Sequence, residues 1–240
     1  MNYNKELFIK CLDELNLTAS DKQINQFYQF YDLLIEKNKV MNLTSITEID
    51  DVIIKHFIDS LSIVKIFDLN SVNSLIDVGT GAGFPGVPIK IMYPELNVVL
   101  MDSLNKRIKF LEESCSQIGL HNIDFIHGRA EELGRNVKYR EQFDICVSRA
   151  VANLSTLSEY CLPFVKVGGN FICYKSGESD DEIKSAKKAV DLLSGVIDDR
   201  VDFELPNSDF SRTLLKIDKV KSMSKKYPRK AGTPSREPLK

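Results

Sequence analysis

Residues 74–86 read Ser-Leu-Ile-Asp-Val-Gly-Thr-Gly-Ala-Gly-Phe-Pro-Gly, and they are the most informative part of the chain about its architecture. Residues 74–78 form a short apolar run that ends in glycines, which is typical of a buried strand. Pro85 suits the first position of a helix, where its missing N–H group leaves no hydrogen bond unmade, so we expect a helix over residues 85–92. Glycine permits positive φ and a close approach of the backbone to a ligand. The pattern therefore predicts a ligand-binding loop at the carboxyl end of a strand.

Two classes of ligand fit this loop. Gly81, Gly83 and Gly86 match the dinucleotide pattern Gly-x-Gly-x-x-Gly, and Asp102 follows about 20 residues later, as that pattern requires. Asp77 instead starts the sequence Asp-x-Gly-x-Gly, which is common in methyltransferases, where an acid lies near the methionine end of the methyl donor. Asp102 ends the second apolar run, so its carboxylate can accept hydrogen bonds from a ribose diol or cap a helix that begins near Asn105.

Apolar runs and helical stripes alternate from residue 74 onwards. Besides the first strand we expect strands over residues 97–101, 123–126, 143–147, 170–174, 196–204 and 212–217. Besides the first helix we expect helices over residues 106–117, 156–162 and 181–193. This alternation predicts a mostly parallel sheet with helices on both faces, and the last two strands predict an antiparallel hairpin at its end. Seven strands in this order are typical of the class I methyltransferase fold, a Rossmann-like α/β architecture.

The chain before the first strand has a different pattern. Apolar residues recur at helical spacing within residues 8–17, 24–35 and 49–61. We therefore expect a helical N-terminal extension over residues 1–70, packed on a core over residues 71–220. Residues 221–240 form a basic C-terminal tail.

The composition indicates where the protein acts and whether it binds a metal ion. The first residues are polar, and no stretch approaches the ~18 consecutive apolar residues of a membrane span. We therefore expect a cytoplasmic protein without membrane contact. The five cysteines are widely spaced and there are only three histidines, so we expect reduced, buried thiols and no metal site.

Charge is distributed unevenly along the chain. The formal net charge is -2, yet the last 22 residues carry eight lysines and arginines and a single acid, Glu237. An acidic body with a basic tail indicates a polyanionic partner, although a solvated terminus has the same composition.

Several motifs together resemble the bacterial 16S rRNA guanine-N7 methyltransferase G family, also called glucose-inhibited division protein B. The matching stretches are residues 42–44, 56–61, 77–86, 102–104 with 106–107, 129–131, 148–151, and 225–230 with Gly232 and Pro234. They extend from the second predicted helix to the tail. The loop ending in Phe84-Pro85-Gly86 and the tail sequence Tyr227-Pro228-Arg229 are specific in combination.

The resemblance implies that S-adenosylmethionine is the methyl donor and that a guanine of 16S ribosomal RNA, free or in the small ribosomal subunit, is the acceptor. It places the donor against Gly79 and Phe84, with Asp77, Gly81 and Gly83 in the same loop. It also places the ribose and adenine beside Asp102, Ser103, Leu104, Ala130 and Glu131. We expect a monomer.

Guanine N7 has a free lone pair and carries no proton, so its methylation needs no general base. Arg149, after the fourth strand, is the candidate catalytic side chain, because it can bind the donor carboxylate or an RNA phosphate. A structural ion pair, for example with Asp77, is the alternative. His56 and Asn42 stay undecided between contacts with the substrate and local capping or turn formation.

The tail residues Lys225, Lys226, Tyr227, Arg229 and Lys230 are the candidate RNA-binding residues, through phosphate contacts and base stacking. Removal of residues 225–240 is then expected to weaken RNA binding more than donor binding. Two other functions remain open: a nicotinamide-dependent oxidoreductase, which the glycine pattern allows, and a non-catalytic RNA-binding protein of ribosome assembly.

Overall fold

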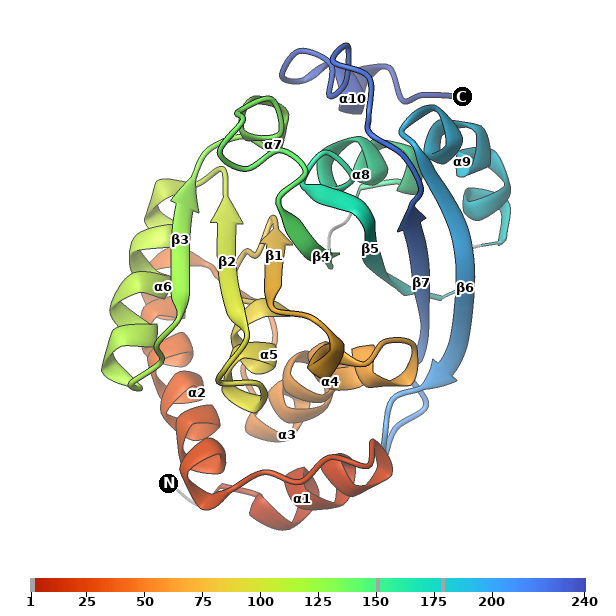
Figure 1. Ribbon diagram of the computed structural model, residues 1–240. Coiled ribbons are helices and arrows are strands. Elements are labelled where there is room, and N and C mark those ends of the chain that lie inside the picture. Colours follow the sequence, from red (N-terminus) through yellow and green to blue (C-terminus); the bar gives the residue numbers. More distant parts are fainter. Residues whose placement is uncertain (1–2, 150–151, 178–179) are drawn as a thin grey trace.

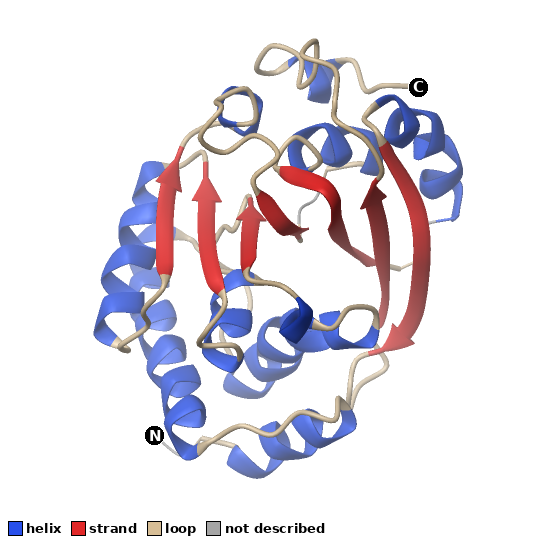
Figure 2. Ribbon diagram, in the orientation of Figure 1, coloured by secondary structure: helices blue, strands red, loops and turns tan. Residues whose placement is uncertain are grey.

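A seven-stranded sheet forms the centre of the molecule (Figures 1 and 2). The computed structural model describes residues 3–149, 152–177 and 180–240. The strand order is β3-β2-β1-β4-β5-β7-β6. The bounds are β1 Ser74–Val78, β2 Asn97–Asp102, β3 Ile123–His127, β4 Phe143–Ser148, β5 Val165–Ser176, β6 Gly195–Glu204 and β7 Ser211–Lys219. The first five strands are parallel, and β7 lies antiparallel between β5 and β6. The predicted class I methyltransferase architecture is confirmed.

Helices cover both faces of the sheet because successive side chains of a buried strand point to opposite faces. Leu75 of β1 packs with the N-terminal helices and with α5 and α6, whereas its neighbour Ile76 packs with α8 and α9. The bounds are α1 Lys5–Glu14, α2 Asp21–Met41, α5 Gly86–Met92, α6 Asn105–Gln117, α8 Leu154–Cys161 and α9 Asp180–Leu192. Two apolar layers thus hold the sheet and fix its carboxyl edge in place.

The N-terminal helices belong to the first of these layers. Phe8 of α1, Phe27 of α2 and Phe57 contact one another and are fully buried. Phe57 lies in an irregular helical run made of α3 (Ile49–Val52), a π-helical turn (Ile53–Ile58), α4 (Asp59–Leu61) and a 3-10 turn (Ser62–Lys65). This packing brings residues 55–59 to the sheet edge where the site is formed.

Some short helical elements were not indicated by the sequence pattern. They are α7 (Ala130–Leu133), a 3-10 turn (Leu69–Ser71) and α10 (Thr233–Arg236). Figure 1 shows α7, α8 and α10 together at the top of the view, above the carboxyl ends of β1, β2 and β3. The C-terminal segment that contains α10 therefore lies against the site region.

Strand β5 begins five residues earlier than expected. Residues 168 and 169 are glycines and indicate a turn, so the pattern predicts a strand that begins at Asn170. A Cβ atom on Gly169 would lie 2.4 Å from the carbonyl oxygen of Asp144, so only glycine fits there. The pairing of β4 with β5 shifts register at this point. The glycine therefore permits close strand pairing rather than ending it.

No helix in the described ranges is both long and apolar enough to cross a bilayer. Within the same ranges, no cluster of histidine, cysteine and acidic side chains is arranged to hold a metal ion.

Candidate functional site

Two cavities meet at the carboxyl edge of the sheet. The first, which we call the loop cavity, has a volume of about 410 Å³ and lies over the ends of β1, β2 and β3. The second, which we call the basic cavity, has a volume of about 610 Å³ and lies between the N-terminal helical run and β5, β7 and α9. Arg149 and Ala152 line both, so a ligand in one cavity lies next to a ligand in the other.

The loop cavity combines apolar walls with a few polar groups, as small-molecule sites do. Its lining residues are Val78, Gly79, Met101, Asp102, Ser103, Arg107, Gly128, Arg129, Ala130, Glu131, Arg149, Ala152, Leu157 and Tyr160. They come from the ends of three adjacent parallel strands and from α7 and α8. This is the position that open α/β sheets use for ligands.

Asp102 ends β2 and faces this cavity with 3% of its surface exposed. Its Oδ1 accepts the Leu104 backbone N–H at 2.8 Å, and its Oδ2 accepts the Gly81 N–H at 2.9 Å. Arg107 adds an ion pair at 3.3 Å. A carboxylate has about four acceptor positions and these three contacts use three of them, so Asp102 keeps room to accept from one ribose hydroxyl. The helix-cap alternative is wrong, because the N-cap of α6 is Leu104 and no side chain caps that helix, whereas Asp102 holds the turn before it.

The glycines of the loop have two different roles. Gly79 has a φ of +76° and nothing lies within 4 Å of the position of a Cβ atom, so its face of the cavity is open. Gly83 has a φ of +101°, and a Cβ atom there would lie 2.8 Å from side-chain carbons of Leu111 and Val87. Gly79 thus leaves room for a ligand, whereas Gly83 lets the loop pack on the helices below it.

Asp77 lies beneath the loop and does not line the cavity. Its buried carboxylate accepts the Thr80 hydroxyl at 2.7 Å and the Gly86 N–H at 2.8 Å through Oδ2, and Oδ1 has no partner. Burial raises the pKa of Asp77 to about 7, although these two hydrogen bonds and Arg149 oppose the shift. Asp77 therefore fixes the loop to α5.

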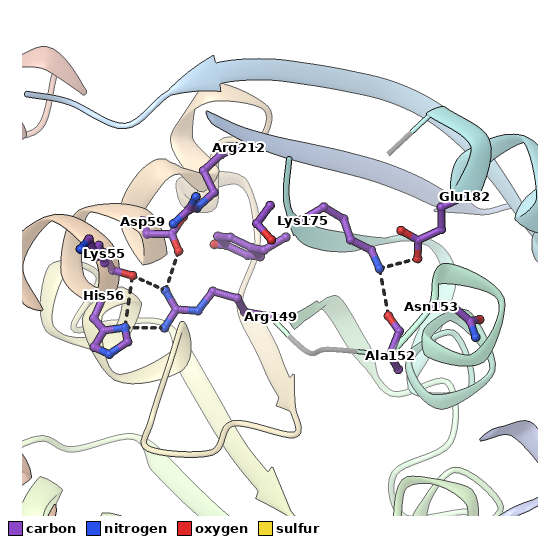
Figure 3. A pocket seen from close by; sticks show the side chains of 11 residues that line it. Lys55, His56, Asp59, Arg149, Ala152, Asn153, Lys175, Glu182 and Arg212 are labelled. Carbon is purple, nitrogen blue, oxygen red and sulfur yellow. Dashed lines mark hydrogen bonds and ion pairs between the residues drawn. The ribbon is translucent and has the colours of Figure 1, made fainter. Parts of the chain in front are cut away.

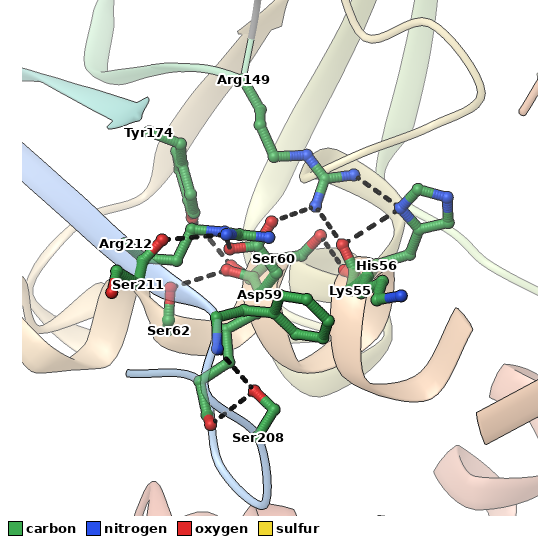
Figure 4. Close-up of polar contacts among 12 residues, drawn as sticks. Lys55, His56, Asp59, Ser60, Ser62, Arg149, Tyr174, Ser208, Ser211 and Arg212 are labelled. Atoms are coloured by element: carbon green, nitrogen blue, oxygen red, sulfur yellow. Dashed lines mark hydrogen bonds and ion pairs between the residues drawn. The ribbon is translucent and has the colours of Figure 1, made fainter. Parts of the chain in front are cut away.

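The basic cavity contains an acid held between two arginines (Figures 3 and 4). Asp59 Oδ2 accepts from Arg149 Nη1 at 2.8 Å, and Oδ1 accepts from Arg212 Nε at 3.0 Å. The Asp59 side chain is only 5% exposed. The alternative partner considered for Arg149, Asp77, is therefore replaced by Asp59. Two guanidinium groups on one carboxylate leave a net positive charge, which favours an anionic ligand.

Two further cations line the basic cavity, and each has an acidic neighbour. Lys55 pairs with Asp51 at 2.8 Å, and Lys175 pairs with Glu182 at 2.6 Å. The excess positive charge of this cavity therefore comes mainly from Arg149 and Arg212.

His56 fixes the other side of the Arg149 guanidinium. His56 Nδ1 lies 3.3 Å from Arg149 Nη2 and 3.1 Å from the carbonyl oxygen of Lys55. Its other ring nitrogen, Nε2, lies 2.9 Å from the Thr44 hydroxyl oxygen. Burial, with the neighbouring Arg149, lowers the pKa of His56 to about 3. His56 is neutral at physiological pH and serves as a hydrogen-bonding support.

Phe84 connects the loop to this network. Its ring stacks on the His56 ring at 4.4 Å between centroids, and the Arg149 guanidinium lies 5.2 Å from its centroid. Phe84 is 5% exposed and does not line the loop cavity. It therefore orients Arg149 and His56 through stacking.

The residue Asn42 ends α2 with a φ of 49°, a conformation that asparagine tolerates. The Asn38 side chain holds the turn that follows. Its Oδ1 accepts the backbone N–H groups of Leu43 and Thr44, and its Nδ2 donates to the Thr44 carbonyl oxygen. This turn presents the Thr44 hydroxyl to His56. The turn interpretation of Asn42 thus accounts for its position.

The predicted donor residues divide into two groups. Gly79, Asp102, Ser103, Ala130, Glu131 and Arg149 line the loop cavity. Asp77, Gly81, Gly83, Phe84 and Leu104 lie outside its lining. Direct donor contacts stay a prediction for both groups. Ala150 and Val151, part of the motif that includes Arg149, lie outside the described residues.

The predicted RNA-binding residues also divide. Lys225, Lys226 and Lys230 are exposed. Tyr227 is only 6% exposed and packs in the core beneath α8 and β5. Arg229 is bound to Glu159, whose side chain is fully buried. The three lysines are free to meet an RNA backbone, whereas Tyr227 and Arg229 fasten the tail to the core.

Sequence reasoning did not single out Arg212, Asp59, Lys175 or Tyr160 for the site. Asp59 lies within a motif that the family resemblance used, but nothing in its spacing indicated two arginine partners. Arg212 belongs to β7 and follows Arg149 by more than 60 residues in the sequence. Only the antiparallel placement of β7 beside β5 brings Arg212 to this edge.

Comparison with known proteins gives consistent relatives. A family model described as rRNA small subunit methyltransferase G matches residues 23–204. The chain is 53% identical to ribosomal RNA small subunit methyltransferase G of Lachnoclostridium phytofermentans, over 97% of this chain and 96% of that protein. It is 50% identical to the protein of the same name from Alkaliphilus oremlandii, over 98% of this chain and 99% of that protein.

Solved structures share the fold at low sequence identity. M. jannaschii TYW2 in complex with AdoMet has a TM-score of 0.50 and 13% identity, and the match covers 62% of this chain and 70% of that one. A putative transferase from Pyrococcus horikoshii has a TM-score of 0.54 and 12% identity, with coverage of 68% and 63%.

Proposed function

The chain belongs to the rRNA small subunit methyltransferase G family, and from that premise we propose that it transfers the methyl group of S-adenosylmethionine to N7 of a guanine in 16S ribosomal RNA. One observation carries the proposal beyond family membership: Arg149 lines both the loop cavity and the basic cavity. A small-molecule donor and a nucleotide acceptor can therefore be held side by side.

The loop cavity suits the donor. Its volume of about 410 Å³ lies within the usual range for ligand sites, ~300–1,000 Å³. The Asp102 carboxylate would accept from a ribose hydroxyl, and Met101 and Leu157 offer apolar surface for the adenine. The open space at Gly79 admits a ligand close to the backbone. When bound, the sulfonium donor supplies an electrophilic methyl group.

The basic cavity suits the acceptor. An RNA nucleotide brings one phosphate and a planar base, and Arg149 and Arg212 offer guanidinium groups for the phosphate. Reaching a base inside structured RNA requires that the nucleotide be exposed or turned out of its stack. The cavity opens on the same edge as the loop cavity, so the base of such a nucleotide would face the donor.

The residues around the acceptor fit a reaction without proton abstraction. His56 stays neutral and both of its ring nitrogens contact neighbouring polar groups, and Asp59 is bound by two arginines. Neither group is free to act as a general base in this arrangement. Guanine N7 needs none, since its lone pair attacks directly. The contribution of the protein is then orientation of the two reactants and exclusion of water.

A labelled methyl-transfer assay tests the proposed function. We expect S-adenosylmethionine with a tritiated methyl group to label 16S rRNA, or small subunits, isolated from cells that lack the protein. The same RNA from cells that contain the protein should accept little label, because its target guanine is already methylated. No label in either substrate would contradict the proposal.

Calorimetry separates the proposal from the oxidoreductase alternative. S-adenosylmethionine or its product S-adenosylhomocysteine should bind, and NADH should not. Binding of the donor without transfer to any form of the RNA would instead favour the non-catalytic alternative. We further propose that the protein acts in the cytoplasm, as a monomer, on ribosomal RNA.

A further inference from the structure

The C-terminal segment, residues 223–236, is built into the core. Arg140 donates to the carbonyl oxygens of Tyr227 at 2.8 Å and Met223 at 3.0 Å, and Arg135 donates to that of Pro228 at 2.8 Å. Glu141 accepts the backbone N–H of Met223 at 2.7 Å. Side chains of the stretch between α7 and β4 thus hold the backbone of the segment, as secondary-structure partners would.

A buried ion pair anchors the middle of this segment. Arg229 Nη2 lies 2.7 Å from Glu159 Oε2, and Arg229 Nε lies 3.0 Å from both carboxylate oxygens. The Arg229 backbone N–H also donates to Glu159 Oε1 at 2.7 Å. Glu159 belongs to α8 and its side chain is fully buried, so Arg229 is its necessary counter-charge.

The segment also contacts a residue of the loop cavity. The backbone N–H of Gly232 donates to Glu131 Oε1 at 2.7 Å. Glu131 lines the cavity from α7 and is 5% exposed. Gly232 has a φ of +82°, a conformation that favours glycine and that turns its N–H toward α7. The segment therefore fixes the orientation of one cavity wall.

Helix α8 provides a second connection between the C-terminal segment and the loop cavity. Thr156 and Glu159, three residues apart, face the C-terminal segment; the Thr156 hydroxyl donates to the Pro234 carbonyl at 2.9 Å. Leu157 and Tyr160, also three residues apart, line the loop cavity. Residues three apart share one face of a helix, so α8 presents one face to the segment and the neighbouring face to the cavity.

We propose that residues 223–236 are a positioning element of the donor site, anchored by Arg229 and acting through Glu131 and α8. The inference rests on the proposed function, in which the loop cavity holds the donor. It assigns to Arg229 a role in donor affinity rather than in phosphate binding. The exposed lysines of the same segment stay available to RNA.

Arg229→Gln tests this role by calorimetry with S-adenosylhomocysteine. We expect the dissociation constant to rise about tenfold, which corresponds to a loss of about 1.4 kcal/mol. The Michaelis constant for RNA and kcat at saturating donor should stay within about twofold of the wild-type values. Lys221→Gln is the matched control, because Lys221 is an exposed cation of the same tail, and its donor affinity should match that of the wild type.

Two outcomes overturn the inference: unchanged donor affinity in Arg229→Gln, or a rise confined to the Michaelis constant for RNA. Hydrogen exchange on the wild-type protein decides the matter if Arg229→Gln does not fold. Binding of S-adenosylhomocysteine should slow exchange of the Gly232 amide, since coupling between two sites is reciprocal. If S-adenosylhomocysteine binds but exchange of the Gly232 amide does not change, the inference is overturned and the proposed function stands. A wild-type protein that binds no donor would instead overturn the proposed function itself.

Discussion

Arg149 and Asp59 form a 2.8 Å ion pair that joins the end of β4 to the N-terminal helical run. The pair lies where the loop cavity and the basic cavity meet, and Arg212 binds the other oxygen of the same carboxylate. The N-terminal helices therefore supply part of the site, and Arg149 is oriented by Asp59, His56 and the ring of Phe84.

Arg149→Ala should abolish most methyl transfer while the protein stays folded. Asp59 keeps Arg212 as a partner, so the substitution leaves no unpaired buried charge, and we expect a loss of about 1–3 kcal/mol in the free energy of unfolding. We expect kcat/KM to fall at least ~100-fold, because the group that we propose to lie between donor and acceptor is missing. Denaturant unfolding and a methyl-transfer assay measure the two effects, and normal turnover would rule out the assigned role.

Asp59→Asn should destabilise the protein more than Arg149→Ala does. The amide leaves two guanidinium groups close together without their counter-charge, and we expect a loss of about 3–5 kcal/mol in the free energy of unfolding. Comparison of the two variants by denaturant unfolding checks the order. The opposite order would mean that Asp59 is not the centre of this network.

Gly79→Ala and Gly83→Ala should fail in different ways. A methyl group at Gly83 meets Leu111 and Val87 at 2.8 Å, so we expect a loss of about 2–3 kcal/mol in stability. A methyl group at Gly79 meets no atom within 4 Å, although the φ of +76° makes alanine cost about 1 kcal/mol in backbone strain, so the main effect should be weaker donor binding. Thermal unfolding and calorimetry distinguish the two, and equal effects on both quantities would contradict the assigned roles.

Asp77 should make stability depend on pH in a defined window. Its folded-state pKa, about 7, lies above its ordinary value of 3.8 because the carboxyl is buried, so the folded protein holds this proton more tightly than the unfolded chain does. The stabilisation from Asp77 is fully present below about pH 4 and is lost as the pH rises through about 7, with an upper limit of about 4 kcal/mol.

Asp77→Asn removes this titration, because the amide resembles the protonated acid and can still accept from Thr80 and Gly86. Denaturant unfolding of both proteins between pH 4 and pH 8 provides the comparison. The wild-type minus variant difference in the free energy of unfolding should fall with rising pH, and parallel curves would show that Asp77 is not buried as a neutral acid.

The exposed lysines Lys225, Lys226 and Lys230 should supply salt-sensitive RNA contacts. A variant with all three changed to glutamine should bind 16S rRNA more weakly and with a shallower dependence on salt concentration, because up to three phosphate contacts are lost. Its donor affinity should not change. Filter binding over a range of salt concentrations checks this, and an unchanged slope would place the RNA contacts elsewhere.

The sequence predicted the sheet well because buried strands carry a local signal. Residues 74–78 and 97–101 are short apolar runs with polar or glycine ends, and both became central strands. The absence of a helical stripe between β6 and β7 was sufficient to predict the hairpin, which the structure confirms. Helix α7 has only four residues, too few for a periodic pattern, so it was missed.

The site was harder to predict because its partners are distant in the chain. The motif around Arg149 identified the arginine, but its acid, Asp59, lies 90 residues away in another element. Arg229 illustrates the same limit: the tail's charge indicated RNA contacts, whereas the buried partner Glu159 lies 70 residues earlier. The charge pattern of a short stretch does not show whether a cation in it pairs with an acid that is distant in the sequence.

The most direct test of the central claim is to map 7-methylguanine in 16S rRNA from cells with and without the protein. Borohydride reduction followed by aniline cleavage breaks the RNA chain at this modification. We expect one cleavage site that is present with the wild-type protein, absent without it and not restored by Arg149→Ala. Identical cleavage patterns in the two strains would contradict it.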